Sequence, residues 1–543
     1  MHLFLYGPPG SGKSTIGRIL ARRLDLPFID LDAVIESSAK QSIRDVFAGE
    51  GESGFRSRER AALTRVIAGA PAVVGLGGGA LLNPESRAQA ECAGEVLCFE
   101  ADAATLERRV ARAPGVRPLL RTPATDCVQP PQAGQAKPIT QLLAERASHY
   151  ASFPRRVTVS DRPPEETADT AQAALGLYRV AGMGSAYSVR VGDGLLDTLG
   201  ARFSELGCGD RTVIVGDTRT LPLYGERAAA SLRAQGITVS LVAIPAGEAS
   251  KTIGTVATLW SAFLKAGIER SHAVVALGGG VVGDLTGFAA ATWLRGVRWI
   301  GLPTTLLAMV DSGLGGKTGA DLPEGKNLIG AFHPPALVLA DTATLATLPA
   351  RELRCGLAEA VKHAVIADPG LLDTLPRFAF CKDSGEAAPC ACLSGAEWLA
   401  PFVARAMAVK IRVIQQDPFE KGPRAALNLG HTIGHGIETS TRFAVQHGEA
   451  VAIGTVLEAR LAEELGLAQP GLAAQLAGLF SSLGLPISPP PGIDLAEVQA
   501  AISLDKKKAG GKVRFALPVH LGEVRTGIAV DDALLARVLN TGM

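Results

Sequence analysis

Three histidines within a short stretch of the chain, His431, His435 and His447, could bind a metal ion. His431 and His435 are four residues apart, so on a helix both imidazoles would lie on one face. His447 follows a turn-prone segment and precedes an apolar run that predicts a helix over residues 449–465. Three imidazoles in an apolar region are typical of a divalent cation site, most often zinc. A catalytic zinc takes three protein ligands, so a carboxylate could replace one of the histidines, and that histidine would be free for proton transfer. The alternative is that the histidines lie on a helix face and bind no metal.

A second chemical pattern stands near the N-terminus. A strand expected over residues 3–6 runs into Gly7-Pro-Pro-Gly-Ser-Gly-Lys-Ser-Thr15, and a helix is expected over 16–24. This fits G-x-x-x-x-G-K-[ST] in the strand–loop–helix context that a phosphate-binding loop requires. Backbone amides and the helix N-terminus would bind phosphate oxygens of ATP, Lys13 would reach the β- and γ-phosphates, and Ser14 would ligate Mg²⁺. The predicted ATP-binding residues of this loop are Gly10, Ser11, Gly12, Lys13, Ser14 and Thr15.

Length and composition limit the possible classes of protein. A chain of 543 residues is expected to form two to four domains, and its 47% hydrophobic content is ample for large cores. The net charge of +1 makes nucleic acid an unexpected partner. The eight cysteines show no C-x-x-C spacing, which favours reduced thiols and a cytoplasmic protein. No apolar run reaches about 18 residues, so no membrane helix is predicted.

Charged residues and glycines follow the phosphate loop in a characteristic order. The series comprises Asp30 and Asp32 at the end of a strand expected over 28–32, Arg56 at the start of a helix, Gly77–Gly79 after a strand, Arg117 at the head of a Pro- and Gln-rich segment, and Arg146 on a helix. With the phosphate loop, this series resembles shikimate kinase over about residues 1–170. Arginine forks suit a small anionic phosphate acceptor, and phosphoryl transfer depends mainly on positioning and charge neutralisation.

The resemblance implies a role for each of these residues. Asp32 would meet the acceptor hydroxyl as base or orienter, and Asp30 would lie near Mg²⁺. Arg117 would close over the ATP phosphates, so the implied catalytic set is Lys13, Asp32 and Arg117. The residues expected to hold the shikimate carboxylate and its neighbours are Asp32, Arg56, Gly78, Gly79 and Arg146.

The chain then changes character twice. A polar, Pro-rich stretch and a helix expected over 167–178 close the first part. Residues 187–345 read as α/β, with strands expected over 212–215, 239–244, 273–277 and 299–302 and helices over 222–235, 251–266 and 284–291. From about 350 to 505 the pattern is helical, followed by a short β hairpin near 513–517. The predicted fold is α/β: a phosphate-loop kinase domain with a parallel sheet (1–178), an NAD-binding α/β domain (179–345) and an all-α metal-binding domain (346–543).

A glycine loop after one of these strands predicts dinucleotide binding. Residues 278–283 satisfy G-x-G-x-x-G between a strand and a helix. The acid that usually follows about 20 residues later is missing, although Asp217, at the end of an earlier strand, could bind the ribose instead. The dinucleotide assignment is therefore only partly supported by the spacing.

The motifs from residue 185 to 535 resemble 3-dehydroquinate synthase. The matching motifs are Gly247-Glu248-x-x-Lys251, Gly278 to Asp284, Leu294-Arg295-Gly, Val310-Asp311-Ser, Gly-Gly-Lys317-Thr, Gly-Lys326-Asn327, Ala-Glu359-Ala-Val-Lys362, Asn428-Leu-Gly-His431 and His447-Gly-Glu449. The resemblance implies NAD in the α/β half and a divalent metal, Zn²⁺ or Co²⁺, held by Glu359, His431 and His447. It leaves His435 as the proton carrier.

The resemblance also implies a substrate, 3-deoxy-arabino-heptulosonate 7-phosphate, and the residues around it. NAD would oxidise a ring hydroxyl to a ketone, and the reduced cofactor would return the hydride after phosphate leaves. The metal would polarise that hydroxyl. The implied NAD-binding residues are Asp217, Gly247, Glu248, Lys251, Gly280, Val281, Val282, Gly283, Asp284, Thr304, Thr305, Lys317, Lys326, Thr344 and Thr347. The implied substrate-binding residues are Arg295, Asn327, Lys410, Arg424, Asn428 and Lys507, and the implied catalytic residues are Asp311, Lys317, Lys362 and His435.

Two other interpretations compete with a bifunctional enzyme of aromatic biosynthesis. The second half could be a glycerol-dehydrogenase-like NAD and metal enzyme, although a lysine-rich phosphate pocket (Lys317, Lys326, Lys507) argues against it. The first half could be a nucleotide-sensing module, although Asp32 and Arg56 argue for catalysis. The expected partners are ATP, shikimate and the heptulosonate phosphate, with a homodimer formed through the synthase half.

Overall fold

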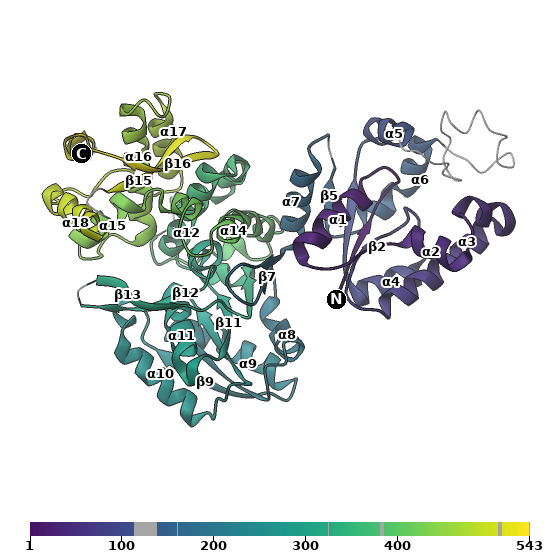
Figure 1. The fold of residues 1–543 in the computed structure, drawn as a ribbon, viewed down its shortest axis with the longest axis horizontal. Helices are drawn as coiled ribbons and strands as arrows, with labels where there is room; N and C mark the ends of the chain where they lie inside the picture. Colours follow the sequence, from purple (N-terminus) through teal and green to yellow (C-terminus); the bar gives the residue numbers. More distant parts are fainter. Residues whose placement is uncertain (113–137, 160, 324, 381–384, 509–512, 542–543) are drawn as a thin grey trace. The chain divides into compact units, whose positions relative to one another are not determined.

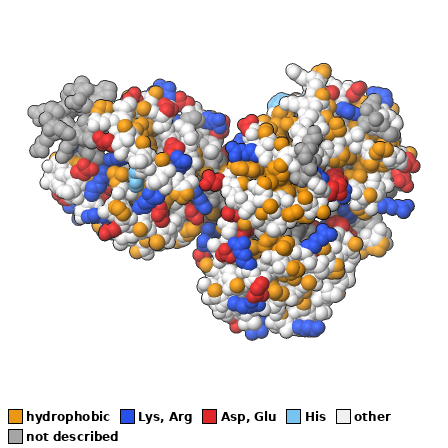
Figure 2. Space-filling model, turned by 180° about the vertical axis from the view of Figure 1, so that it is seen from behind, with side chains coloured by type: hydrophobic (Ala, Val, Ile, Leu, Met, Phe, Trp, Pro, Cys, Tyr) orange, Lys and Arg blue, Asp and Glu red, His pale blue; other side chains and the backbone are white. Residues whose placement is uncertain are grey.

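The computed structural model describes residues 1–112, 138–159, 161–323, 325–380, 385–508 and 513–541 (Figure 1). Contacts divide the chain into two compact units, Met1–Arg179 and Val180–Met543. Among the described residues, no helix has the length and apolar character needed to cross a membrane. Figure 2 shows basic and acidic side chains interspersed over the face seen from behind, as expected for a chain with a net charge of +1.

The first unit is built on a five-stranded sheet in the order β2-β3-β1-β4-β5, with parallel neighbours. Its strands are β1 (His2–Tyr6), β2 (Phe28–Asp30), β3 (Val73–Gly75), β4 (Gly94–Glu100) and β5 (Arg156–Thr158). Phe4 and Tyr6 pack into one core, and Leu3 and Leu5 pack into another. The central strand is therefore apolar on both faces, as a parallel sheet covered by helices requires.

The helices of the first unit place the acids differently from the predicted strand ending. They are α1 (Lys13–Leu24), α2 (Leu31–Ala39), α3 (Ile43–Ile67), α4 (Pro84–Ala93), α5 (Ala103–Arg112), α6 (Ile139–Ala151) and α7 (Pro164–Leu175). Strand β2 ends at Asp30, whose side chain accepts a hydrogen bond from the Asp32 backbone amide and caps α2. Asp32 thus lies in the first turn of a helix and not in a strand.

A seven-stranded sheet among the described residues has the order β6-β7-β14-β11-β10-β8-β9; β6 spans the boundary between the units, and the other six strands belong to the second unit. The strands are β6 (Leu177–Val180), β7 (Tyr187–Gly192), β8 (Arg211–Asp217), β9 (Thr238–Ile244), β10 (Ala273–Gly278), β11 (Arg298–Pro303) and β14 (Leu337–Asp341). The helix expected over 167–178 is wrong at its end, because Gly176, with φ of 62°, terminates α7 and residues 177–180 form β6.

Helices and a hairpin accompany this sheet. They are α8 (Leu199–Glu205), α9 (Glu226–Arg233), α10 (Ile253–Lys265), α11 (Gly280–Thr292) and the antiparallel pair β12 (Lys317–Leu322) and β13 (Gly325–Phe332). Helix α11 begins at Gly280, earlier than the expected start at residue 284, so the glycine loop itself forms the helix N-terminus. Nothing in the alternation of the sequence had predicted the hairpin.

The remaining elements form a helical region. They are α12 (Ala350–Ile366), α14 (Leu399–Gln416), α15 (His431–Ser440), α16 (His447–Glu464), α17 (Leu472–Ser482), α18 (Leu495–Lys508), α19 (Asp532–Thr541) and the hairpin β15 (Arg514–His520) with β16 (Glu523–Ala529). The hairpin expected near 513–517 is therefore longer than predicted, and the region is not purely helical. Helix α16 packs against α12, α15 and α17.

The approach of α15 to α16 depends on glycine. A Cβ atom at Gly454 of α16 would lie 2.0 Å from the carbonyl oxygen of Gly430, which immediately precedes α15. Backbone atoms at that distance cannot move aside without shifting a helix. The close contact fixes where α15 begins relative to α16.

We predict that Gly454→Ala lowers the free energy of unfolding of the second unit by about 1–3 kcal/mol, the usual cost of overpacking. Gly478→Ala on α17 is the matched control, since its Cβ would meet nothing within 4 Å. That variant should keep or slightly raise stability, because alanine favours a helix. Denaturant unfolding measures both. Equal stability of the two variants would contradict the close packing.

Candidate functional sites

A cavity of about 1020 Å³ lies where the phosphate loop, Asp30, Asp32 and the glycine loop after β3 meet. These segments follow β1, β2 and β3, so the cavity is at the carboxyl ends of neighbouring parallel strands, where ligands bind in such sheets. The predicted residues that line it are Gly10, Gly12, Lys13, Ser14, Thr15, Asp30, Asp32, Arg56, Gly78, Gly79 and Arg146. Ser11 is buried within the loop, and Arg117 lies outside the described residues.

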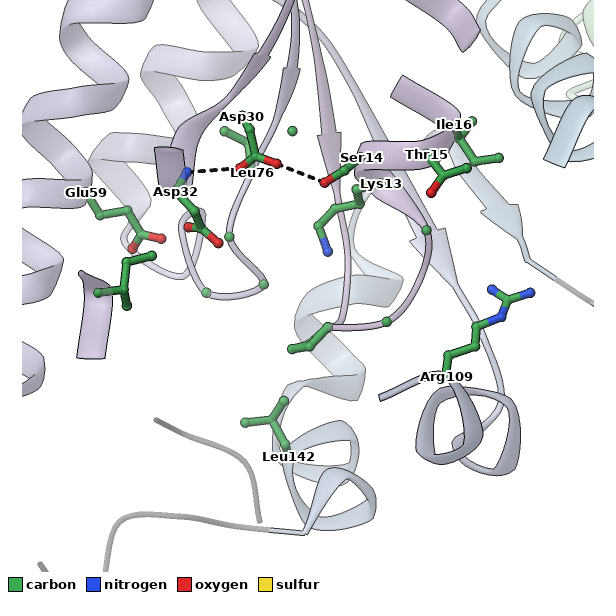
Figure 3. Close-up of a pocket in the computed structure, with 18 of the residues that line it drawn as sticks. Lys13, Ser14, Thr15, Ile16, Asp30, Asp32, Glu59, Leu76, Arg109 and Leu142 are labelled. Atoms are coloured by element: carbon green, nitrogen blue, oxygen red, sulfur yellow. Dashed lines mark hydrogen bonds between the residues drawn. The ribbon is translucent and has the colours of Figure 1, made fainter. Parts of the chain in front are cut away.

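The phosphate loop places Lys13 at the start of a helix. Gly12 has φ of 86° and α1 begins at Lys13, so the free amides of the first helical turn face the loop. The Lys13 ammonium donates hydrogen bonds to the carbonyl oxygens of Gly7 and Pro8 at 2.8 and 2.9 Å. In the view of Figure 3, Lys13 lies between Asp32 and Glu59 on one side and Arg109 on the other.

Asp30 and Asp32 have separate environments. The Ser14 hydroxyl donates to Asp30 Oδ2 at 2.9 Å, so Asp30 is on the side of the phosphate loop (Figure 3). Asp32 Oδ1 lies next to the glycine loop, 3.5 Å from where a Cβ of Gly77 would be. One carboxylate therefore faces the phosphate loop and the other faces the glycine loop on the remaining part of the cavity.

Arg56 is held by a glutamate to which the sequence assigned no role. Arg56 donates to Glu59 Oε2 at 2.6 Å, and Glu59 is only 3% exposed. Burial raises the pKa of the Glu59 carboxyl, and the Arg56 guanidinium opposes that shift. The i, i+3 spacing of the two residues on α3 could have identified the pair. A Cβ at Gly79 would lie 2.6 Å from the Arg56 guanidinium, so a larger residue there would displace the end of the Arg56 side chain.

Arg146 also lies against the glycine loop. It donates to the Gly78 carbonyl oxygen at 2.9 Å, and the Tyr150 hydroxyl donates to the same oxygen at 2.7 Å. Arg109, on α5, lines the cavity as well and was not predicted. The cavity of about 1020 Å³ therefore joins cations, a glycine loop and four acids, which are Asp30, Asp32, Glu36 and Glu59.

In the second unit, Glu359, His431 and His447 converge from three helices. Glu359 lies in the middle of α12, while His431 and His447 are the first residues of α15 and α16. Glu359 Oε1 is 3.6 Å from His431 Nε2 and 3.3 Å from His447 Nε2. One donor atom of each residue lies within 4.8 Å of the others.

The donor atoms of this cluster fit a divalent cation. The Nδ1 atoms of His431 and His447 lie 3.0 Å from the Leu429 carbonyl oxygen and 3.2 Å from Glu438 Oε2. With Nδ1 donating to those oxygens, Nε2 of each ring is the nitrogen left to ligate a cation beside Glu359. Glu359 is fully buried, and its Oε1 accepts no hydrogen bond from the described residues. Two imidazole nitrogens and a carboxylate oxygen form a typical ligand set for catalytic zinc.

Electrostatics in the cluster agree with this arrangement. Burial and the Lys362 ammonium lower the pKa of His431 to about 3, so its imidazole is neutral. Burial lowers the pKa of His447, but Glu359 and Glu438 outweigh burial and raise it to about 10. A cation bound at Nε2 would therefore displace a proton from His447.

His435 differs from the two buried histidines. Its side chain is 59% exposed, and its Nε2 lies 3.9 Å from Glu438 Oε2. His435, Glu438 and His447 form a second group whose donor atoms are within 4.8 Å of one another. Among the described residues, distances alone allow these two triads, which share His447, and a third one formed by Asp311, Glu359 and His363. Glu438 had no predicted role, although it lies on the same helix as His431 and His435.

Alternating charges surround the buried carboxylate. Lys362 forms an ion pair with Glu359 and lies 3.7 Å from Asp311 Oδ1, while Lys410 lies 2.8 Å from the same Asp311 oxygen. Burial lowers the pKa of Lys410 against the effect of Asp311. For Lys362, burial is outweighed by Glu359 and Asp311, which raise its pKa. Four predicted residues thus form one connected group.

The dinucleotide half contributes a second group. Lys251 is buried and forms ion-pair and hydrogen-bond contacts with Asp284 at 2.7 Å and Asn327 at 2.6 Å. Gly280 lies against Ser312, whose hydroxyl would be 2.8 Å from a Cβ there. The start of α11, the loop before α10 and hairpin β12–β13 therefore meet at one place.

Hairpin β12–β13 also contacts the helical region through two lysines. Lys317 forms an ion pair with Glu420, and Asn428 donates to the same carboxylate at 3.1 Å. Lys326 lies 3.4 Å from Glu438 and 3.5 Å from Glu248. These contacts connect Lys317 and Lys326, which are predicted to bind NAD, with the helical region, where Asn428 is predicted to bind substrate.

The other predicted residues have the following positions. Asp217 ends β8 and accepts hydrogen bonds from the amides of Arg219 and Thr220; Gly247 and Glu248 follow β9; Val281, Val282 and Gly283 lie in α11; Thr304 and Thr305 follow β11; Thr344 and Thr347 contact Tyr224; and Arg424 is buried. Arg295 is exposed at the far end of α11 from Gly280, away from the glycine loop. Lys507 lies in α18, where its side chain is not described.

Comparisons with known proteins cover both units. Residues 9–175 match the shikimate kinase family, residues 241–355 match the 3-dehydroquinate synthase N-terminal family, and residues 356–508 match its C-terminal family. The predicted combination of a phosphate-loop kinase domain with a dehydroquinate-synthase-like region is confirmed.

Relatives of the second unit are similar over nearly their whole length. The 3-dehydroquinate synthase of Symbiobacterium thermophilum is 46% identical over 62% of this chain and 92% of its own, and that of a Synechococcus strain is 44% identical over 65% and 95%. The structure of 2-epi-5-epi-valiolone synthase from Streptomyces hygroscopicus, with NAD⁺ and Zn²⁺ bound, is 31% identical with a TM-score of 0.60, covering 67% of this chain and 99% of its own. This chain belongs to the 3-dehydroquinate synthase family and carries a shikimate kinase unit before the synthase.

Proposed function

We propose that the two sites perform the two reactions of these families: ATP-dependent phosphorylation of shikimate, and conversion of the heptulosonate phosphate to 3-dehydroquinate and phosphate. The convergence of Glu359, His431 and His447 from three helices is the observation that carries the synthase assignment. For the kinase it is the single cavity that joins the phosphate loop to Asp32 and the arginines. Assays of both reactions on the purified chain test the proposal.

In the kinase, the separation of the two acids supports different tasks. Asp30, bonded to Ser14, would complete the Mg²⁺ environment of ATP. Asp32 would accept or orient the proton of the shikimate hydroxyl, and Arg56 and Arg146 would bind the shikimate carboxylate. Glu59 would hold Arg56 in place for that contact.

In the synthase, Glu359, His431 and His447 would hold Zn²⁺ or Co²⁺, and the glycine loop at α11 would hold NAD. When bound, these groups supply polarisation of a substrate hydroxyl and acceptance and return of a hydride. Lys410, Asp311 and Lys362 would orient the anionic substrate and its hydroxyls. His435, which is exposed and one helical turn from His431, would carry the proton.

The synthase relatives do not favour the glycerol-dehydrogenase alternative, because the curated relatives matched over this half are dehydroquinate synthases. The valiolone synthase is a more distant relative at 31% identity, so the heptulosonate phosphate is the favoured substrate over that enzyme's. A homodimer formed through the synthase half and a cytoplasmic location complete the proposal.

The first prediction separates the two activities. Lys13→Ala should lower shikimate phosphorylation about 100-fold or more, because a cation on the transferred phosphoryl group is lost. Phosphate release from the heptulosonate phosphate should stay near wild type, since the two units have separate cores. Arg60→Ala, which removes an exposed cation from α3, is the control and should keep both activities. Loss of both activities in folded Lys13→Ala protein would contradict independence.

The second prediction compares the two acids. Asp32→Asn should lower kinase kcat by about 100-fold or more with little change in the KM for ATP, because general bases contribute on that order. Asp30→Asn should instead raise the concentrations of Mg²⁺ and ATP needed for half-maximal activity, because Asp30 contacts Ser14. Steady-state kinetics at varied Mg²⁺ decide between them. If Asp32→Asn mainly weakens ATP binding, the assigned roles are exchanged.

The third prediction concerns the metal. Glu359→Ala, His431→Ala and His447→Ala should each lose bound metal and synthase activity while shikimate phosphorylation persists. His435→Ala should keep stoichiometric metal yet lose turnover, because only proton transfer is removed. His520→Ala, an exposed histidine of β15, is the control. Metal analysis checks all five variants. A metal-free His435→Ala with a metal-full Glu359→Ala would favour the triad of His435, Glu438 and His447.

A further inference from the structure

We propose that Glu438 is a positioning residue for the metal site: it fixes the ring of His447, and Lys326 fixes Glu438 in turn. The proposal rests on the ligand set given above. It assigns a role to a buried acid that neither the motifs nor the comparisons assign, and it links hairpin β12–β13 to a ligand on α16.

The first step is the contact between Glu438 and His447. Glu438 lies on α15, is 4% exposed, and its Oε2 is 3.2 Å from His447 Nδ1. A carboxylate accepts but does not donate, so Nδ1 must carry the proton. The opposite nitrogen, Nε2, is then the one that faces Glu359 at 3.3 Å. Glu438 therefore sets both the tautomer and the direction of the ligand.

The second step is the contact between Glu438 and Lys326. Lys326 Nζ is 3.4 Å from Glu438 Oε1, the oxygen that does not face His447. The same ammonium lies 3.5 Å from Glu248 Oε1 and 4.1 Å from the centre of the Phe443 ring. A buried carboxylate is costly without a counter-charge, so the Lys326 ammonium stabilises the Glu438 side chain in this position.

The same contacts argue against a second cation at Glu438. The donor atoms of His435, Glu438 and His447 are close enough for one. However, the Lys326 ammonium already occupies the side of Glu438 away from His447 and repels a cation there. His447 also cannot present Nδ1 to a second ion while that atom donates to Glu438. The second group is therefore the outer support of the first site.

The test measures Zn²⁺ affinity of the full chain by competition with a chromophoric chelator, without NAD or substrate. Glu438→Ala should raise the Kd for Zn²⁺ about 10–100-fold, the usual cost of losing such a support. Glu438→Gln should raise it less, because an amide oxygen can still accept the His447 proton. As a single variant, Lys326→Met should raise the Kd for Zn²⁺. Combined with Glu438→Ala, it should cause no further increase. Thermal unfolding of the second unit verifies that each variant folds, because kinase activity would report only on the separate first unit.

Glu248→Gln is the matched control, since Glu248 contacts the same lysine but no histidine. Its Kd should stay within about 2-fold of wild type, because the loss of one charge near the site changes little by itself. An unchanged Kd in Glu438→Ala overturns the inference, as does an equal loss in Glu248→Gln. Unchanged affinity in His447→Ala would instead overturn the ligand set itself. If Glu438→Ala does not fold, Glu438→Gln and Lys326→Met still decide, because both must weaken Zn²⁺ binding.

Discussion

The synthase half depends on one buried charge, the carboxylate of Glu359. A fully buried, ionised carboxyl group is strongly unfavourable unless cations surround it. Burial raises the pKa of Glu359, but Lys362 one turn along the helix outweighs burial and keeps the group ionised. The remaining oxygen faces the two histidines. The chain therefore keeps a negative charge inside a helical core, directed at the place where a divalent cation would neutralise it.

The neighbouring residues follow from this constraint. Lys362 needs acids near it, and Asp311 stands on its other side; Lys410 then neutralises Asp311. These groups come from α12, from the turn before β12 and from α14, so the alternation of charge ties the α/β half to the helical half. Hairpin β12–β13 repeats the pattern with Lys317 and Lys326, each opposite a glutamate of the helical region. Each of these lysines is thus held in place by an acid.

Much of this arrangement was predictable from sequence, and the exceptions share a cause. The phosphate loop and the family of each half were predicted from local motifs, and the comparisons confirm those families. The roles of individual site residues stay predictions. Glu59 and Glu438 were given no role from the sequence, because their importance comes from contacts with Arg56 and His447 that no short motif encodes. The helical position of Asp32 was missed because the Asp30 side chain caps α2, and the start of α11 was missed because the glycine loop itself enters the helix at Gly280.

Two of the three expected metal ligands are the first residues of their helices, and the third lies within a separate helix. Helix ends open more readily than helix centres. A cation that joins α12, α15 and α16 would therefore hold the first turns of α15 and α16 in place. Ligand binding to the folded state stabilises it by mass action. With a metal bound at these residues, the lifetime of the synthase half in a cell would follow metal supply. Because the kinase is on the same polypeptide, proteolysis that begins at a metal-free synthase half would degrade the kinase too. Metal scarcity would thereby lower the amount of an enzyme that uses no zinc.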